Sequence, residues 1–237
     1  MAFTIKNAPR IRSLIRLTLP KYFDAKTYIW NRFSSADAIL IDIRQKTTYT
    51  DPWRRQVLAK VLDGVPYKPR VYLEATSRRI SRKIWAEDIA TCSHKGLYGF
   101  LIKVRDGNIL NEVETIVRRD GKPLQQLVEG DHRILSKIVP HYQKDAALLM
   151  DFELKAIPYA VFKYHNFGSR DEGSWSRLEE LVNYAQLANV KALAWRSMYS
   201  ARVRDIEREM LTLKEIGFSG VLVRNSALID MANKIFE

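Results

Sequence analysis

The 237-residue chain has a single cysteine, Cys92, so no disulfide can form within it. A lone cysteine fits a reducing compartment, and we expect a cytoplasmic protein. No apolar run approaches the roughly 20 residues that a membrane-spanning helix needs. Basic residues are spread through positions 1–20 instead of preceding one apolar stretch, so the pattern predicts no export signal.

Several short catalytic motifs are also missing. The sequence contains no Gly-rich phosphate loop, no dinucleotide fingerprint and no Gly-x-Ser-x-Gly turn, which argues against the usual nucleotide-binding and hydrolase sites. The four histidines are scattered without the spacing of a metal-binding pair, which argues against a zinc site.

Positive charge is what the chain has in excess. Lysine and arginine number 39 against 27 acids, a net charge of +12. Such a charge attracts anions of every kind, so a small anionic ligand, an acidic protein surface or nucleic acid could be the partner. Two basic clusters could contact phosphates, but solvated helix faces explain them better, and we favour nucleic acid least. The clusters are Arg78, Arg79, Arg82 and Lys83, and Arg202, Arg204 and Arg208.

Short apolar runs alternate with longer amphipathic segments, which predicts an α/β fold with a parallel sheet. No linker divides the chain, so residues 1–237 are expected to form one domain. Eight runs would close a TIM-type (β/α)8 barrel. The predicted strands are residues 11–18, 38–43, 70–75, 98–103, 147–152, 159–162, 191–194 and 220–223.

Helical periodicity fills most of the intervals. One βα unit is expected to be irregular, because residues 154–158 are too few for a crossover helix between the fifth and sixth predicted strands. Residues 121–145, by contrast, are too many for a loop, and a helix is predicted at 124–138. The other predicted helices are residues 51–62, 77–93, 108–119, 174–189, 202–216 and 226–236.

Four segments, in the same order, resemble the citrate lyase beta-subunit family of aldolase-like enzymes. Arg12-Ser13-Leu14 resembles the opening Arg-Ser-Leu strand of that family. The segment from Ser35 to Ile43 resembles its second strand, and Gly99 to Val104 its Leu-Pro-Lys-Val-Glu strand. Gly217-Phe218-Ser219-Gly220, with the later Asn233 and Phe236, keeps the spacing of the closing motif.

The resemblance implies an enzyme that cleaves or forms carbon–carbon bonds next to a carbonyl. Members of the family use Mg²⁺ held by a Glu and an Asp, together with an Arg that stabilises the enolate. A hard cation prefers carboxylate oxygens and acts as a Lewis acid. The Arg presents a fixed positive fork to the same developing charge.

The sequence departs from the family where these groups should stand. The Glu-Asp pair after the second strand becomes Arg44-Gln45, and the catalytic Arg maps to Tyr72. The Glu of the fourth strand becomes Arg105, and the closing His-Pro becomes Arg224-Asn225. The resemblance leaves Glu153 as a metal ligand, with Asn166 at the second ligand position. Mg²⁺ binding would then be weak or would depend on a ligand, and no other cofactor is implied.

The ends of the strands form the functional mouth of such a barrel. A basic mouth suits a carboxylate, phosphate or CoA-type anion, because Arg binds these groups bidentately. The alternative is a salt-bridge network that fills a pocket without chemistry. Asp42, on an apolar strand, is expected to be buried and structural. The candidate ligand-binding residues are Arg44, Tyr72, Glu74, Lys103, Arg105, Arg196 and Arg224.

Three functions therefore stay open, and a basic nucleic-acid-binding module is the one favoured least. The first is a divergent carbon–carbon lyase that binds an anionic substrate at its mouth. The second is a barrel without catalysis, a pseudoenzyme that acts as a binding or assembly protein, and either could form a homo-oligomer or a protein complex. Loss of one of the paired metal acids weakens the first interpretation. The sequence names no substrate.

Overall fold

Parallel pairing joins strands that follow one another along the chain, as the alternation of strand and helix segments predicts. The computed structural model describes residues 10–18, 33–42, 69–74, 96–103, 125–131, 159–164, 172–187, 190–196 and 202–237. Contacts group the chain into two compact units, Leu14–Gln126 and a second unit of Met1–Ser13 with Leu127–Glu237.

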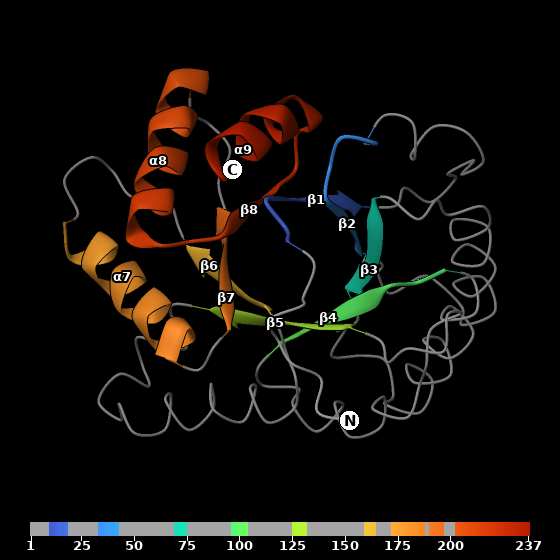
Figure 1. Cartoon of the computed structure of the whole chain (residues 1–237), viewed down its shortest axis with the longest axis horizontal. Coiled ribbons are helices and arrows are strands. Elements are labelled where there is room, and N and C mark those ends of the chain that lie inside the picture. The colour runs from blue at the N-terminus through green and yellow to red at the C-terminus, as the bar shows by residue number, and fades with distance from the viewer. Residues whose placement is uncertain are drawn as a thin grey trace. The chain divides into compact units, whose positions relative to one another are not determined.

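The unit Leu14–Gln126 holds four parallel strands, labelled in Figure 1. One line of register partners runs through Arg16, Leu40, Tyr72 and Gly99. Every residue of the second strand is buried, as expected of a strand covered on both faces. The strands are β1 (Ser13–Thr18), β2 (Ala38–Asp42), β3 (Arg70–Glu74) and β4 (Gly99–Lys103).

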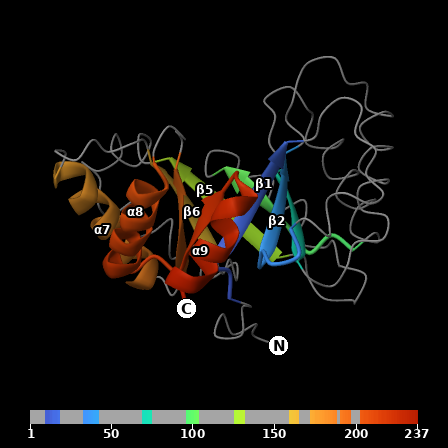
Figure 2. The ribbon, with the colours of Figure 1, turned by 90° about the horizontal axis from the view of Figure 1, so that it is seen from above.

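The other unit holds the remaining strands, again parallel, and the described helices. Helices α7 and α8 lie along one side of β6–β8 (Figures 1 and 2). The strands are β5 (Gln125–Asp131), β6 (Tyr159–Tyr164), β7 (Lys191–Arg196) and β8 (Gly220–Val223). The helices are α7 (Glu172–Leu187), α8 (Val203–Ile216), the short 3₁₀ turn η4 (Ser226–Leu228) and α9 (Ile229–Ile235).

Helix α8 is amphipathic and packs its apolar side on the strands. Met210 and Leu213 are buried, while most of the other side is exposed. The helix ends at Gly217, whose φ of 108° is left-handed and therefore suits glycine. Phe218 follows at once and packs edge-on against Phe162 of β6, with ring centroids 6.4 Å apart. The Gly-Phe pair thus turns the chain from helix into strand.

The segment just before β1 runs beside β8. The amide of Val221 donates to the carbonyl oxygen of Arg12 at 3.0 Å. Gly220 makes this approach possible, because a Cβ there would lie 2.3 Å from the carbonyl oxygen of Ile11. The Ser13 hydroxyl donates to Asn233 of α9 at 2.7 Å.

The helix predicted at 124–138 was wrong over residues 125–131, which form the fifth strand, β5. The segment 147–152, predicted as that strand, lies outside the described residues. Residues 132–158 separate β5 from β6, so these two strands are not neighbours across the five-residue connection that suggested an irregular unit. The other predicted strands are confirmed to within two residues.

The predicted helices fall into two groups. Those at 174–189, 202–216 and 226–236 are confirmed as α7, α8 and η4 with α9. Those at 51–62, 77–93 and 108–119 lie outside the described residues. The structure confirms the parallel α/β character of the predicted barrel. None of the described helices is long and apolar enough to cross a membrane.

Candidate functional site

The side chains of β1 alternate between two faces. Ser13 faces α9, because its hydroxyl bonds to Asn233. Successive side chains of a strand point to opposite faces, so Leu14 and Arg16 lie on the face of β1 opposite to that of Ser13. In strand-and-helix barrels this is the face that lines the interior.

An ion-pair cluster occupies this face at the carboxyl ends of β1–β3. Nη2 of Arg16 donates to Oδ2 of Asp42 at 2.6 Å, and Nε donates to Oε2 of Glu74 at 2.7 Å. Asp42 and Glu74 are register partners that end neighbouring strands. The three residues are only 7%, 6% and 1% exposed. We call Arg16, Asp42 and Glu74 the Arg16 cluster.

The two carboxylates hold the guanidinium in its charged form. Burial by itself lowers the pKa of Arg16, because a charge is less stable away from water. The nearby charges of Glu74 and Asp42, with their hydrogen bonds, outweigh burial, and the pKa lies above its ordinary value. The cluster therefore contains a permanent buried cation at any pH at which a protein is normally handled.

Leu40 of β2 is the register partner of Arg16, and Tyr72 of β3 is the register partner of Leu40. Tyr72 therefore lies in the same layer of the sheet as Arg16. Its side chain is fully buried, and its ring packs edge-on against Tyr98 at 5.6 Å between centroids. Arg70 lies over the ring of Tyr98, with 5.5 Å from its guanidinium carbon to the centroid. Tyr72 is thus a packed aromatic residue at the position where the family resemblance places a catalytic arginine.

The basic residues predicted at the mouth are placed only in part. Lys103 ends β4, and Arg196 ends β7 in register with Tyr164. Arg224 follows β8 directly and is exposed. Arg44 and Arg105 lie outside the described residues. Each of the three placed residues therefore stands at a carboxyl strand end, as predicted.

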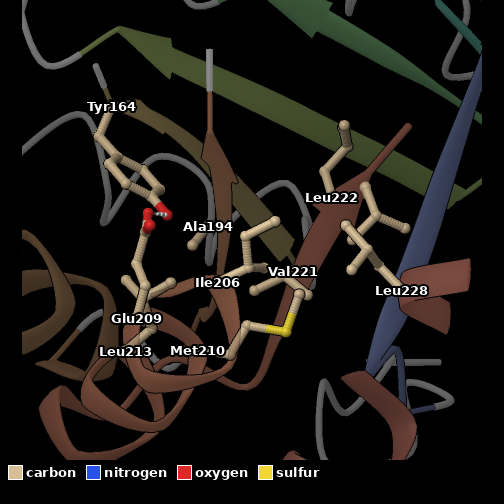
Figure 3. Close-up of a pocket in the computed structure, with 10 residues that line it drawn as sticks. Tyr164, Ala194, Ile206, Glu209, Met210, Leu213, Val221, Leu222 and Leu228 are labelled. Atoms are coloured by element: carbon tan, nitrogen blue, oxygen red, sulfur yellow. Dashed lines mark hydrogen bonds between the residues drawn. The ribbon is translucent and has the colours of Figure 1, made fainter. Parts of the chain in front are cut away.

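A small cavity of about 30 Å³ lies between α8 and β6–β8. Its lining is almost wholly apolar, with Ala194 and Val221 facing Met210 and Leu213. Tyr164 donates a hydrogen bond to Glu209 at its edge (Figure 3). Because this cavity is small and lies on the side of the strands that α8 covers, it is a packing defect and not a substrate site.

The described residues do not fit a magnesium site. No three of their His, Cys, Asp or Glu side chains come together as metal ligands. The two acids that do converge, Asp42 and Glu74, are bonded to Arg16. Glu153 lies outside the described residues, and it is not part of β5, which was the reason for choosing it.

Arg16 is the functional residue that sequence reasoning missed. It lies between Ile15 and Leu17 in a buried strand, which is an unusual place for an isolated charge. That position was a usable signal, because a buried Arg must find acids on neighbouring strands. Asp42 was correctly predicted to be buried, and Glu74, predicted as a ligand-binding residue, is buried and accepts a hydrogen bond from Arg16.

Comparisons with known proteins agree on the fold. No protein-family model and no curated protein matches the sequence. Solved structures do match. RipC from Yersinia pestis is 13% identical, with a TM-score of 0.58 over 96% of this chain and 95% of that one. A citrate lyase from Burkholderia xenovorans is 11% identical, with a TM-score of 0.70 over 97% and 77%.

CitE from Mycobacterium tuberculosis, in complex with magnesium and acetate, is 11% identical with a TM-score of 0.62 over 96% of this chain and 91% of that chain. Sequence identities this low show a shared fold and nothing about function. The resemblance to the citrate lyase beta-subunit family that the sequence motifs predicted is confirmed at that level, and the chain has a divergent form of this fold.

Proposed function

We propose that this protein is a divergent citrate lyase beta-subunit-like barrel that binds a small anionic ligand and lacks the metal-dependent bond cleavage of its family. The Arg16 cluster carries this proposal. It lies on the interior-type face, at the strand ends where such barrels have their active sites. Its two acids are bonded to a guanidinium, and Tyr72 stands where a catalytic Arg is expected.

The proposal includes a closed (β/α)8 barrel formed by β1–β8 within one domain. Two observations support closure. The pairing is parallel and sequential within each unit. The segment before β1 also hydrogen-bonds to β8 through Arg12 and Val221, as the meeting of first and last strands in a barrel requires.

The ligand would be a carboxylate, phosphate or CoA-type anion held by basic residues at the strand ends. Lys103, Arg196 and Arg224 stand at such ends, and Arg44 and Arg105 would join them in a closed barrel. The fork of an Arg fits these anions. CitE structures that share the fold hold acetate, pyruvate, or acetoacetate with coenzyme A, which supports the choice of ligand class.

Any role of magnesium would depend on the ligand. The strand-five motif of the family carries a metal-binding Glu, and the observed strand contains Leu127-Val128-Glu129. We therefore propose Glu129, in place of Glu153, as the corresponding position. A single carboxylate binds Mg²⁺ poorly unless a substrate adds oxygens. When bound, the ion would supply Lewis-acid polarisation of a ligand carbonyl.

A thermal-unfolding titration tests anion binding. Phosphate, pyruvate and coenzyme A are added to the protein, with sodium chloride at matched ionic strength as the control. A bound anion raises the melting temperature by mass action. Changing Arg44 and Arg224 together to Met should abolish the shift, while Arg204→Met, an exposed site on α8, should leave it unchanged.

An assay of malyl-CoA and citryl-CoA cleavage with Mg²⁺ tests the loss of chemistry. We expect no turnover above background, because Tyr72 cannot supply the charge of an Arg. Turnover that disappears in Glu129→Gln would instead identify a working lyase. A phosphate shift that survives in the Arg44 and Arg224 double variant would place the anion elsewhere and favour the phosphate-contacting basic clusters.

A further inference from the structure

In the Arg16 cluster two carboxylates surround one positive group, as carboxylates surround the cation in a metal site. Asp42 and Glu74 are register partners on adjacent strands, and adjacent strands lie about 4.8 Å apart. Two buried carboxylates this close repel each other and need a cation or a proton between them. The guanidinium of Arg16 meets one oxygen of each, at 2.6 Å and 2.7 Å.

These contacts are short for an N–H donor, as expected when both partners are charged. The donors are two different nitrogens, Nη2 and Nε, so the planar fork spans both acids at once. Arg16 lies on β1 in the layer of Leu40 and Tyr72, which come two residues before Asp42 and Glu74 on their strands. Its side chain therefore extends toward the carboxyl ends of the strands.

From this geometry we infer that Arg16 is a built-in cation, which takes the place of a bound metal ion between the acids of β2 and β3. The positive charge between the two acids is then supplied by the chain itself. A divalent ion cannot enter, because the guanidinium fills the space between the oxygens and repels a second positive charge. Removal of Arg16 should leave a latent cation site made of Asp42 and Glu74.

This inference rests on the proposed function and sharpens its ligand class. Because Asp42 and Glu74 already hold the guanidinium, a ligand gains nothing from chelating a metal ion at these two acids. Pyruvate, which can chelate through its keto group, and propionate, which cannot, should bind with similar affinity. A chelating agent such as EDTA should leave both affinities unchanged.

The test is cation rescue of Arg16→Ala, measured as melting temperature after treatment with EDTA. We expect the variant to melt well below the wild type. Millimolar guanidinium or Mn²⁺ should raise its melting temperature on the order of 5 °C, since either can bind between the freed carboxylates. Urea and sodium chloride serve as controls for the guanidinium salt. The wild type should respond to neither cation.

The matched control replaces both acids of the cluster with neutral side chains of similar size. Arg16→Ala combined with Asp42→Asn and Glu74→Gln should melt above Arg16→Ala alone and should lose the rescue. If Arg16→Ala fails to fold, the triple variant must still fold, because the defect is repulsion between the acids. Arg16→Lys keeps a positive charge and should fold without response to Mn²⁺.

Three results would overturn the inference: stabilisation of the wild type by Mn²⁺ without ligand, a folded Arg16→Ala protein that ignores both cations, or a triple variant that fails to fold. These three results come from the folding of the variants or from melting temperatures with added cations. The proposed function is tested instead by the change in melting temperature with phosphate. A failure of one can therefore be told from a failure of the other.

Discussion

Arg16 is buried between apolar neighbours, yet its surroundings keep it charged. An isolated buried ion would be strongly destabilising, and the hydrogen-bonded acids offset that penalty. The sequence made both acids visible, Asp42 as a buried residue and Glu74 as a strand-end residue. It could not show that one Arg from β1 reaches both, because that depends on which residues share a layer across three strands.

We expect Arg16→Met to lower the free energy of unfolding by about 3–5 kcal/mol, because it leaves two buried carboxylates without their cation. Urea unfolding followed by circular dichroism measures the change. Arg204→Met, on the exposed side of α8, should change stability by less than about 0.5 kcal/mol. A loss below about 1 kcal/mol for Arg16→Met would show that water still solvates the acids.

The contribution of Arg16 should not depend on pH in the alkaline range. A base whose pKa rises on folding stabilises fully below its unfolded pKa, and this stabilisation is lost only as the pH rises through the folded value. For Arg both pKa values lie well above the alkaline range in which proteins are usually studied. The difference in unfolding free energy between wild type and Arg16→Met should therefore not shrink from about pH 7 to about pH 10, and it grows if the two acids of the variant share a proton near neutral pH. A difference that shrinks over this interval would contradict the assignment.

At the level of elements, β5 marks the limit of sequence reasoning. Its seven residues, Gln125–Asp131, include only Leu127 and Val128 as large apolar side chains. No apolar run marks it, so the more hydrophobic segment 147–152 was preferred. Strand formation here follows from pairing with β6, and such tertiary context overrides local preference. The strands with continuous apolar runs, such as β2, were predicted to within one residue.

The link between β6 and α8 through Tyr164 and Glu209 can be tested directly. Tyr164→Phe removes the donor and should lower the free energy of unfolding by about 1 kcal/mol. Glu209→Gln keeps an acceptor oxygen and should cost less. Thermal or urea unfolding of both variants gives the comparison. Equal losses would mean that the hydrogen bond stabilises this contact only when Glu209 is charged.

Gly220 is the first residue of β8, and the backbone of Ile11 and Arg12 passes close to it. Gly220→Ala would push a Cβ against the carbonyl oxygens of Ile11 and Arg12, at 2.3 Å and 2.7 Å. Backbone cannot yield as a side-chain tip does, so we expect a loss of about 1–3 kcal/mol in unfolding free energy. Thr212→Ala on α8 serves as the surface control, with an effect within about 0.5 kcal/mol. An unchanged stability for Gly220→Ala would refute this close approach.

For the whole molecule, the charge of +12 and the Arg16 cluster lead to one expectation about metals. The free protein should not bind Mg²⁺ with micromolar affinity, because its converging acids already hold a cation. Isothermal titration calorimetry of the EDTA-treated protein measures this. Heat that fits a micromolar site would contradict it, and loss of that heat in Glu129→Gln would assign it to β5.

The contact between the opening segment and the end of the chain bears on how the protein is made. Ser13 and its partner Asn233 are 220 positions apart in the sequence. A ribosome adds about 5–20 residues per second, so residues 11–13 wait on the order of ten seconds or more before β8 and α9 emerge. During that time their backbone lacks its final neighbours. Capture of the opening segment is therefore a late event in folding, which cannot precede the synthesis of β8 and α9.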